Sequence, residues 1–446
     1  MASRFPEVRS IAALAAPIVV TQVGSMMLGV VDMLMVGGLG REALAAASLG
    51  NLWLFGTLVV GMGVVLGIDP VLTQAHGAGD GRGVGLALQR GLVIAGVVTV
   101  PTVLLWLATE PALLLVGQSP ELARMAHDYV LVQLPSAFAF FGFTALRSYL
   151  QGRGITRPAM WVTLAVNVLN ACFNWILIYG HLGFPALGLV GAGIATGITR
   201  SLMLVLLALL VWRARLHDGA WQSWSRAAID PAGLGEILRH GIPVGIQLGL
   251  EVWAFQAATL FAGWLGDAEL AAHTIVLNLA SLAFMVPLGI SMATVTRVGN
   301  LIGARDPRAA QHAAWVALAM GAAVMAFSAI TFVALRDVLP RFYAEADPLV
   351  LTLAASALPI AGAFQLLDGT QVVGGGILRG MGRTRPAAVF NLVGYYALGL
   401  PLGYWLAFEA GMGLPGIWWG LTLGLAVVAA LLVAWIAARG PAHVSH

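Results

Sequence analysis

The stretch LGREALAA at residues 39–46 returns as LGDAELAA at residues 265–272, and this repeat decides the fold. Further along each half, GRGITRP at 152–158 corresponds to GMGRTRP at 380–386. Matching stretches at nearly one constant separation indicate that the chain consists of two halves built on the same plan. The sequence around these stretches tells what each half contains.

The composition is that of a membrane protein. The chain has 446 residues, of which 59% are hydrophobic and 10% are charged, with a mean hydropathy of +0.89. A soluble globular domain has roughly 25% charged residues, so a soluble enzyme, a disordered chain and a nucleic-acid binder are excluded. All 23 basic residues are Arg, and the net charge is only +3. The single cysteine, Cys172, excludes an intrachain disulfide.

Apolar runs separated by Gly, Pro and charged residues predict the membrane spans. A spanning helix needs about 20 mostly apolar residues. Arg4 and Arg9 precede the first run, which is too long for a cleaved leader and holds Asp32, so we assign it as the first span. Twelve spans result: 11–37, 47–75, 86–108, 128–150, 159–180, 187–212, 238–264, 273–297, 310–336, 351–378, 387–408 and 413–437.

The arginines predict the orientation of these spans. The connections that follow odd-numbered spans hold only Arg41, Arg124, Arg336 and Arg341, and Arg200 lies inside a span. The other arginines lie at the termini, in the remaining connections or at their flanking helix ends. The positive-inside rule then places both termini in the cytoplasm of a multi-pass protein of the inner membrane.

The fold class that follows is all-α, with twelve transmembrane helices in two pseudo-symmetric six-helix lobes. We expect the first lobe at 1–212, a polar cytoplasmic linker at 213–237 and the second lobe at 238–446. Lobes of six spans have the same topology, which predicts parallel repeats framing a central, alternately open cavity. The alternative is an old duplication that only stabilises the bundle.

Three acids inside predicted spans are candidate functional residues: Asp32 late in span 1, Glu251 in span 7 and Asp368 in span 10. Asp69 in span 2 precedes Pro70, and we assign it to a kink rather than to a site. Acids in the membrane interior are costly and mark ion or substrate pathways by default. None of them has an arginine three or four residues away on its helix. Such a carboxyl can take up a proton or hold a bare cation, and Glu251 and Asp368 are candidate Na+ ligands. The alternative is a protonated acid that only hydrogen bonds to a neighbouring helix.

Several neutral polar residues on spans 5 and 6 are candidates for a site with Asp32. Asn167, Asn170 and Asn174 share one face of span 5, because spacings of three and four place side chains together on a helix. With Thr196 on span 6 and Asp32 they form a candidate substrate site. Hydrogen bonding between packed helices would explain the same pattern.

Two other features inside the spans have weaker implications. Arg200 either snorkels or pairs with an unidentified acid, and we assign it no function. Gly416, Gly420 and Gly424 form a GxxxGxxxG stripe, which predicts a close-packing helix face.

Enzyme motifs are absent from the sequence. It contains no HExxH, Walker A, GxSxG or Asp-rich magnesium motif. GAGD at 77–80 spells the GxGD string of intramembrane aspartyl proteases, but GARD at 303–306 occupies the equivalent turn of the second half. We therefore interpret both as turns, and we expect neither enzymatic activity nor a cofactor.

The sequence resembles the multidrug and toxic compound extrusion (MATE) transporters, in particular their NorM-like branch. The resemblance covers essentially the whole chain. It is carried by Pro17 and Pro243 early in spans 1 and 7, by the turn QGRGITRP at 151–158, by NACFNWILIYG at 170–180 and by the exit of span 2 from Pro70 to Gly79.

The resemblance implies a site on each lobe. NorM-like members use acids equivalent to Asp32, Glu251 and Asp368 for coupling or for substrate. Archaeal-type members couple protons through the first lobe, at positions matching Asp32, Asn170 and Asn174. Where those members have an aspartate this chain has Asn174, and because an amide does not titrate, a proton mechanism confined to the first lobe is in doubt.

The predicted function is a Na+- or H+-coupled antiporter that exports cationic amphipathic drugs and toxic organic compounds by alternating access. Its partners would be small organic cations and membrane lipid, with no nucleic acid, and the protein would be monomeric. The alternative is a lipid-linked oligosaccharide flippase or another exporter of the same superfold. The basic loop between spans 2 and 3 that marks a major-facilitator transporter is not clear in this sequence. A receptor or structural membrane protein would not need three buried acids.

Overall fold

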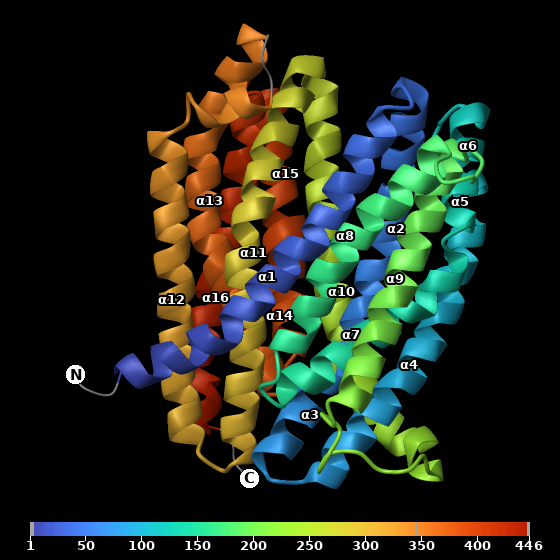
Figure 1. Ribbon diagram of the computed structural model, residues 1–446. Coiled ribbons are helices and arrows are strands. Elements are labelled where there is room, and N and C mark those ends of the chain that lie inside the picture. The colour runs from blue at the N-terminus through green and yellow to red at the C-terminus, as the bar shows by residue number, and fades with distance from the viewer. Residues whose placement is uncertain (1–3, 344–346, 444–446) are drawn as a thin grey trace. The chain divides into compact units, whose positions relative to one another are not determined.

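The computed structural model describes residues 4–343 and 347–443, which are helical with short connections (Figure 1). In the first half the elements are α1 (Arg4–Gly37), α2 (Arg41–Val65), α3 (Ile68–Gly77), α4 (Gly81–Leu107), α5 (Thr109–Leu115), α6 (Pro120–Leu131), η1 (Leu134–Ser136), α7 (Ala137–Gly152), α8 (Arg157–Tyr179), α9 (Gly188–Arg213) and η2 (Arg226–Ile229). In the second half they are α10 (Pro231–Leu265), α11 (Asp267–Gly303), α12 (Pro307–Ala334), η3 (Leu339–Phe342), α13 (Pro348–Gly380), α14 (Arg385–Asn391), η4 (Leu392–Gly399), α15 (Leu400–Tyr404), η5 (Trp405–Glu409), α16 (Leu414–Arg439) and η6 (Pro441–His443).

Within the described residues, 11 helical stretches are long and apolar enough to cross a membrane, and a bent pair makes up to 12. The bent pair is Pro120–Leu131 with Leu134–Gly152, which meet at 45°. The prediction of an all-α membrane protein is confirmed. The predicted span at 128–150 falls on this bent pair, and Pro135, which lacks the N–H that a continuous helix needs, lies at the break.

The chain folds into two compact units. The N-terminal unit is Val20–Gly245, and the C-terminal unit consists of Met1–Val19 together with Ile246–His446. Both α1 and α10 pass from one unit to the other just after an internal proline, Pro17 or Pro243. Proline inside a helix removes a backbone hydrogen bond, so the passage occurs at equivalent weak points of the two repeats.

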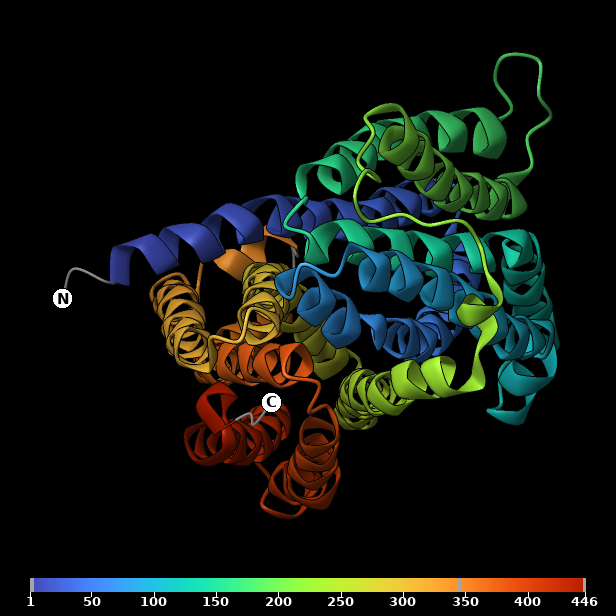
Figure 2. The ribbon, with the colours of Figure 1, turned by 90° about the horizontal axis from the view of Figure 1, so that it is seen from below.

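The segment between α9 and α10 lies on the N-terminal unit and covers its helix ends (Figure 2). Gln89 Nε2 donates to Gln222 O at 2.7 Å, and Tyr149 Oη donates to Ala220 O at 3.3 Å. A Cβ at Gly81 would lie 2.0 Å from Gly219 O, so only glycine permits this approach. The polar segment is therefore a packed part of this unit.

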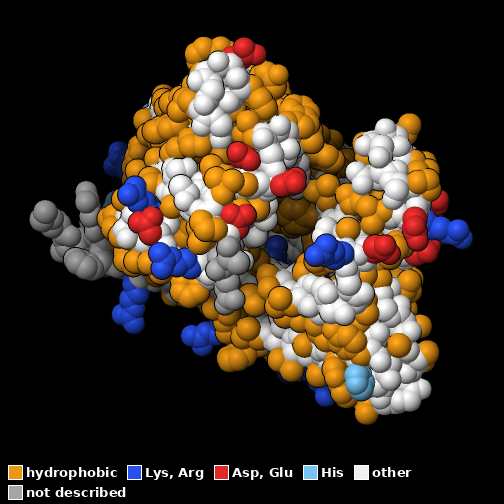
Figure 3. Space-filling view, turned by 90° about the horizontal axis from the view of Figure 1, so that it is seen from above, with side chains coloured by type: hydrophobic (Ala, Val, Ile, Leu, Met, Phe, Trp, Pro, Cys, Tyr) orange, Lys and Arg blue, Asp and Glu red, His pale blue; other side chains and the backbone are white. Residues whose placement is uncertain are grey.

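The two equivalent turns after α3 and α11 are built alike. Asp80 Oδ1 accepts from Gly83 N at 2.8 Å, and Asp306 Oδ1 accepts from Ala309 N at 3.0 Å, so each aspartate caps the helix that follows. The interpretation of GAGD and GARD as turns is confirmed. At the opposite helix ends, which Figure 3 shows from above, acidic and basic side chains lie in small groups among hydrophobic and neutral atoms.

The glycine stripe of α16 is a close-packing face, as its sequence predicts. A Cβ at Gly420 would lie 2.2 Å from Gly403 Cα, and one at Gly424 would lie 2.3 Å from Gly394 O. Small residues let backbones approach in this way when no hydrophobic effect drives helices together in lipid. The stripe fixes α16 against η4 and α15, which follow the helix carrying Asn391.

Gly420→Ala is expected to destabilise the protein by about 1–3 kcal/mol, because the added methyl group overlaps backbone atoms that cannot move without separating the helices. Thermal unfolding in detergent measures the loss. Gly29→Ala is the matched control, since a Cβ there has nothing within 4 Å. Equal melting temperatures for the two variants would contradict the proposed packing.

An ion pair attaches the first turns of α1 to α11 within the C-terminal unit. Arg297 Nε lies 2.7 Å from Glu7 Oε1, and Arg297 Nη2 lies 2.9 Å from Glu7 Oε2. The contact is bidentate and the Glu7 side chain is only 13% exposed. Charge-assisted forks of this geometry are among the stronger polar contacts in proteins.

A double-mutant cycle with Glu7→Gln and Arg297→Gln is expected to give a coupling energy of about 1–3 kcal/mol in unfolding measurements. The same cycle at Arg215 and Asp218, an exposed pair at 3.1 Å, serves as the control. Solvent screening limits such a pair to about 0.2–1 kcal/mol. No excess coupling at Glu7 and Arg297 would show that α1 is not held by this pair.

Candidate cation and substrate sites

The predicted residues around Asp32 come together inside the N-terminal unit. α1 supplies Asp32, which is 4% exposed, α8 supplies Asn170 and Asn174, and α9 supplies Thr196. Both asparagines are fully buried. Three helices thus bring one carboxyl and several neutral donors and acceptors to one point, where Asn170 and Asn174 are four residues apart on α8.

Asp32 is held by neutral donors. Asn174 Nδ2 donates to Asp32 Oδ1 at 2.5 Å, and Thr196 Oγ1 donates to Asp32 Oδ2 at 2.7 Å. Asn170 Oδ1 in turn accepts from Asn174 Nδ2 at 3.3 Å. Asn174 Oδ1 is buried and makes no hydrogen bond within the described part of the chain, so an acceptor oxygen beside the carboxyl remains available to a cation.

Thr196 can serve both charge states of Asp32. Its Oγ1 lies 2.7 Å from Asp32 Oδ2 and 3.0 Å from Ala192 O, but it has one proton to donate. With a carboxylate, the hydroxyl donates to Asp32. With a protonated acid, Asp32 donates to the hydroxyl, which then donates to Ala192 O. The site therefore keeps its hydrogen bonds when the carboxyl gains or loses a proton.

A second group of residues connects this site to Arg200. Arg200 Nη1 donates to Gln133 Oε1 at 3.0 Å, and its guanidinium lies 5.9 Å from the centre of the Phe140 ring. Its charge also acts on Asp32 without forming an ion pair with it. The expected acid partner of Arg200 is thus an amide. Sequence reasoning did not single out Gln133, because glutamine gives no pattern of its own.

Asn167 occupies a different place from Asn170 and Asn174. Its Nδ2 donates to Gly24 O at 3.0 Å and to Thr163 O at 2.8 Å. Among the described residues its hydrogen bonds are to backbone alone, so Asn167 joins α8 to α1 rather than contacting Asp32.

The C-terminal unit brings Glu251 on α10 together with a buried polar cluster. Glu251 Oε2 accepts from Gln371 Nε2 at 3.2 Å, and Gln371 lies one turn beyond Asp368 on α13. Asn391 Oδ1 is 3.5 Å from Gln371 Nε2, and Tyr395 follows Asn391 by one turn. The charges of Glu251 and Asp368 also act on each other. Glutamine three residues after an acid was the signal that could have identified Gln371.

Several oxygens of this cluster are available to a small cation. Asp368 Oδ1, Gln371 Oε1, Asn391 Nδ2 and Tyr395 Oη are buried and have no hydrogen-bond partner among the residues that the structure describes. Hard monovalent cations prefer oxygen ligands, and two nearby carboxylates repel each other unless a cation neutralises them. The described residues contain no group of three or more His, Cys, Asp or Glu that fits a metal ion.

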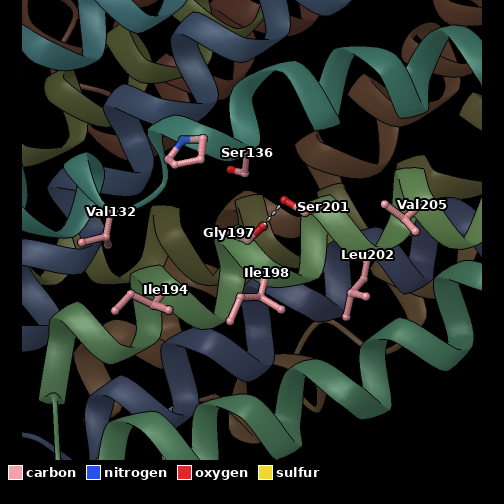
Figure 4. A pocket seen from close by; sticks show the side chains of 9 residues that line it. Val132, Ser136, Ile194, Gly197, Ile198, Ser201, Leu202 and Val205 are labelled. Atoms are coloured by element: carbon pink, nitrogen blue, oxygen red, sulfur yellow. Dashed lines mark hydrogen bonds between the residues drawn. The ribbon is translucent and has the colours of Figure 1, made fainter.

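A pocket of about 310 Å³ lies at the break between α6 and α7, against α9 (Figure 4). Val132, Ile198, Leu202 and other apolar side chains line it. Its Ser201 Oγ donates to Gly197 O at 2.9 Å and is therefore satisfied. The lining has no charged side chain, so this pocket is not the cation site.

Comparison with known proteins identifies one family over most of the chain. The sequence matches the MatE family over residues 17–176 and 243–405. It is 39% identical over 430 residues to the multidrug resistance protein NorM of Burkholderia vietnamiensis, covering 95% of this chain and 92% of that protein. It is 35% identical to the multidrug and toxin extrusion protein 1 of Xenopus tropicalis, covering 93% of this chain and 71% of that protein.

Solved structures share the architecture. The crystal structure of the eukaryotic MATE transporter AtDTX14 superposes with a TM-score of 0.91 at 25% identity, covering 98% of this chain and 97% of the other. The matched regions include α1, α8, α10 and α13, which carry Asp32, the asparagines, Glu251 and Asp368. The chain is therefore a member of the MatE family of membrane transporters and is not an enzyme.

Proposed function

We propose that the protein exports amphipathic organic cations in exchange for Na+ or H+. One observation carries the proposal: each unit holds an acid whose hydrogen-bond partners are neutral, Asp32 with Asn174 and Thr196 in one unit and the partly buried Glu251 with Gln371 in the other. In the part of the chain that the structure describes, none of Asp32, Glu251 and Asp368 has an ion pair with Arg or His. A carboxyl in such surroundings can exchange one monovalent cation for another.

In the C-terminal unit, Na+ or H+ from outside would bind at Glu251 and Asp368 and remove their mutual repulsion. Neutralising the pair changes the relative stability of the outward-open and inward-open states, and the drug is released. Loss of the cation to the cytoplasm then restores the negative charge. Gln371, Asn391 and Tyr395 supply the polar groups that rearrange around the pair.

In the N-terminal unit, Asp32 would attract the cationic group of the substrate, with Asn170, Asn174 and Thr196 beside it. Thr196 keeps the carboxyl hydrogen-bonded in either charge state. Aromatic and methionine side chains hold the apolar part of the substrate. Asn167 shapes this region by holding α8 to α1.

The setting we propose is the cell inner membrane, with both termini in the cytoplasm, lobes at 1–212 and 238–446 and a cytoplasmic linker at 213–237. The protein needs no resident cofactor, acts as a monomer and meets only lipid and small organic cations. Relatives named multidrug resistance protein support a broad substrate range. A flippase for lipid-linked oligosaccharides would face an anionic substrate, which buried acids repel.

Glu251→Gln is expected to abolish resistance to ethidium in cells while the protein remains expressed and folded, because an amide cannot bind or release the coupling cation. Ethidium efflux is measured with Na+ and pH varied separately. Glu236→Gln, near the start of the same helix, is the matched control and should retain efflux. Full resistance of the Glu251 variant would overturn the coupling assignment.

Thr196→Val is expected to weaken ethidium binding at least about tenfold, because Asp32 Oδ2 loses a hydrogen bond worth about 1.5–3 kcal/mol to a charged group. Ethidium fluorescence with purified protein measures the affinity. Thr196→Ser should restore it. Thr102→Val, a buried threonine that bonds to Val98 O, should leave it unchanged. Unchanged affinity in Thr196→Val would separate Asp32 from substrate binding.

A further inference from the structure

The connection between α9 and α10 runs along α4 inside the N-terminal unit. At the first residue of α4, Gly81 packs so closely against Gly219 that a Cβ would overlap the Gly219 carbonyl oxygen. Further along, Arg90, the tenth residue of α4, donates from Nε to Ala227 O at 3.2 Å. These two points are about 14 Å apart along the helix. The connection therefore lies beside the first part of α4 and not beyond its end.

This placement puts the connection at the depth of the lipid headgroups. α4 has 27 residues and is about 40 Å long. A bilayer has a hydrocarbon core of about 30 Å and a thickness of about 40–45 Å with its headgroups. A segment beside the first part of α4 thus extends from the aqueous surface through the headgroups to the edge of the hydrocarbon core. Side chains that it turns away from the protein meet lipid there.

The connection has an inner and an outer face. Ala220 and Ala228 are buried against the unit, with exposed fractions of 4% and 0%. Trp221, Trp224 and Ile229 turn outward, with exposed fractions of 38%, 55% and 60%. Tryptophan is enriched where a membrane meets water, because its ring is apolar and its N–H is polar. The outer face is typical of a segment that lies in the membrane interface.

Side chains of neighbouring helices hold the connection in place through its backbone. Gln89 Nε2 on α4 donates to Gln222 O at 2.7 Å, and Arg153 Nη2, just after α7, donates to Asp218 O at 3.2 Å. These bonds use carbonyl oxygens of the connection and leave its outward side chains for other contacts. The outer face is therefore preformed, and a ligand can bind to it without first ordering the chain.

Two arginines give this region a positive charge. Arg82 at the start of α4 and Arg226 at the start of η2 are exposed and form no ion pair within the described residues. Glu236 on α10 is exposed as well. The acids of the connection and of the turn before α4 already hold other groups: Asp80, Asp218 and Asp230. A guanidinium binds the oxygens of a phosphate through paired hydrogen bonds.

We propose that residues 221–229 form a docking surface for acidic phospholipids of the surrounding membrane. Trp224 and Ile229 contact the upper part of the acyl chains, while Arg226 and Arg82 bind the headgroup phosphate. Asp230 follows this surface directly and caps α10 by accepting from Gly233 N at 3.0 Å. A bound lipid therefore also stabilises the point at which α10 begins.

A fluorescent label on the outer face tests the proposal in the full-length protein reconstituted into phosphatidylcholine liposomes. Ser225→Cys places the label beside Trp224, and Cys172→Ser removes the other thiol. Phosphatidylglycerol or phosphatidylcholine, brominated near the top of the acyl chains, is then added as a quencher. Brominated phosphatidylglycerol should reach half-quenching at an at least about fivefold lower fraction of the lipid. Aqueous iodide should quench little.

Arg226→Gln should raise the half-quenching fraction of phosphatidylglycerol about fivefold, which is the contribution of one arginine near an acidic membrane surface. Quenching by phosphatidylcholine should not change. Arg41→Gln is the matched control, because Arg41 is exposed at the start of α2, one span away from this end of α4. It should behave like the parent protein.

Thermal unfolding in detergent gives a second measurement that needs no label. Added phosphatidylglycerol should raise the melting temperature more than phosphatidylcholine does, and Arg226→Gln should reduce this difference. Equal effects of the two lipids in both measurements would show that the headgroup charge is not recognised. Quenching by iodide and by neither lipid would place residues 221–229 in water. Each of these results overturns the docking surface and leaves the proposed export of organic cations untouched.

Discussion

The structure depends on how carboxyl side chains are stabilised inside a membrane, where water is absent. Backbone groups in a bilayer are satisfied by helix formation, but side-chain acids must find their own partners. Here the partners of Asp32 and Glu251 are amides and a hydroxyl rather than arginines. An arginine in a fixed ion pair would neutralise each acid permanently. Neutral donors hold the acid in place, so that a mobile cation can balance its charge.

The two units differ in the hydrogen-bond partners that they give to their acids. In the N-terminal unit both oxygens of Asp32 have donors, and Arg200 acts on it only at a distance through its charge. In the described part of the C-terminal unit, Asp368 Oδ1, Gln371 Oε1 and Tyr395 Oη have no hydrogen-bond partner. The first arrangement suits a steady negative site for an organic cation. The second suits a site whose hydrogen bonds are completed by an entering ion and its water. The two related repeats thus surround their acids with different partners.

Much of this was predictable from sequence, because membrane spans, helix caps and glycine stripes follow from local composition. The turns at Asp80 and Asp306, the α16 stripe and the acids inside the spans belong to this class. The bend at Pro135 was missed, because the apolar run around it is continuous. Gln133 was missed because a single neutral side chain in an apolar helix gives no periodic signal. Gln371 was missed although it follows Asp368 by three residues on the same helix. Their importance comes from which other helix they meet, which only the fold determines.

Competition binding tests the central claim most directly. Ethidium affinity of the purified protein is measured across a series of Na+ concentrations and, separately, of pH values. The account predicts that affinity falls as the coupling cation rises, and that replacing both Glu251 and Asp368 by amides removes this dependence. Affinity independent of both Na+ and H+ in the wild-type protein would contradict it.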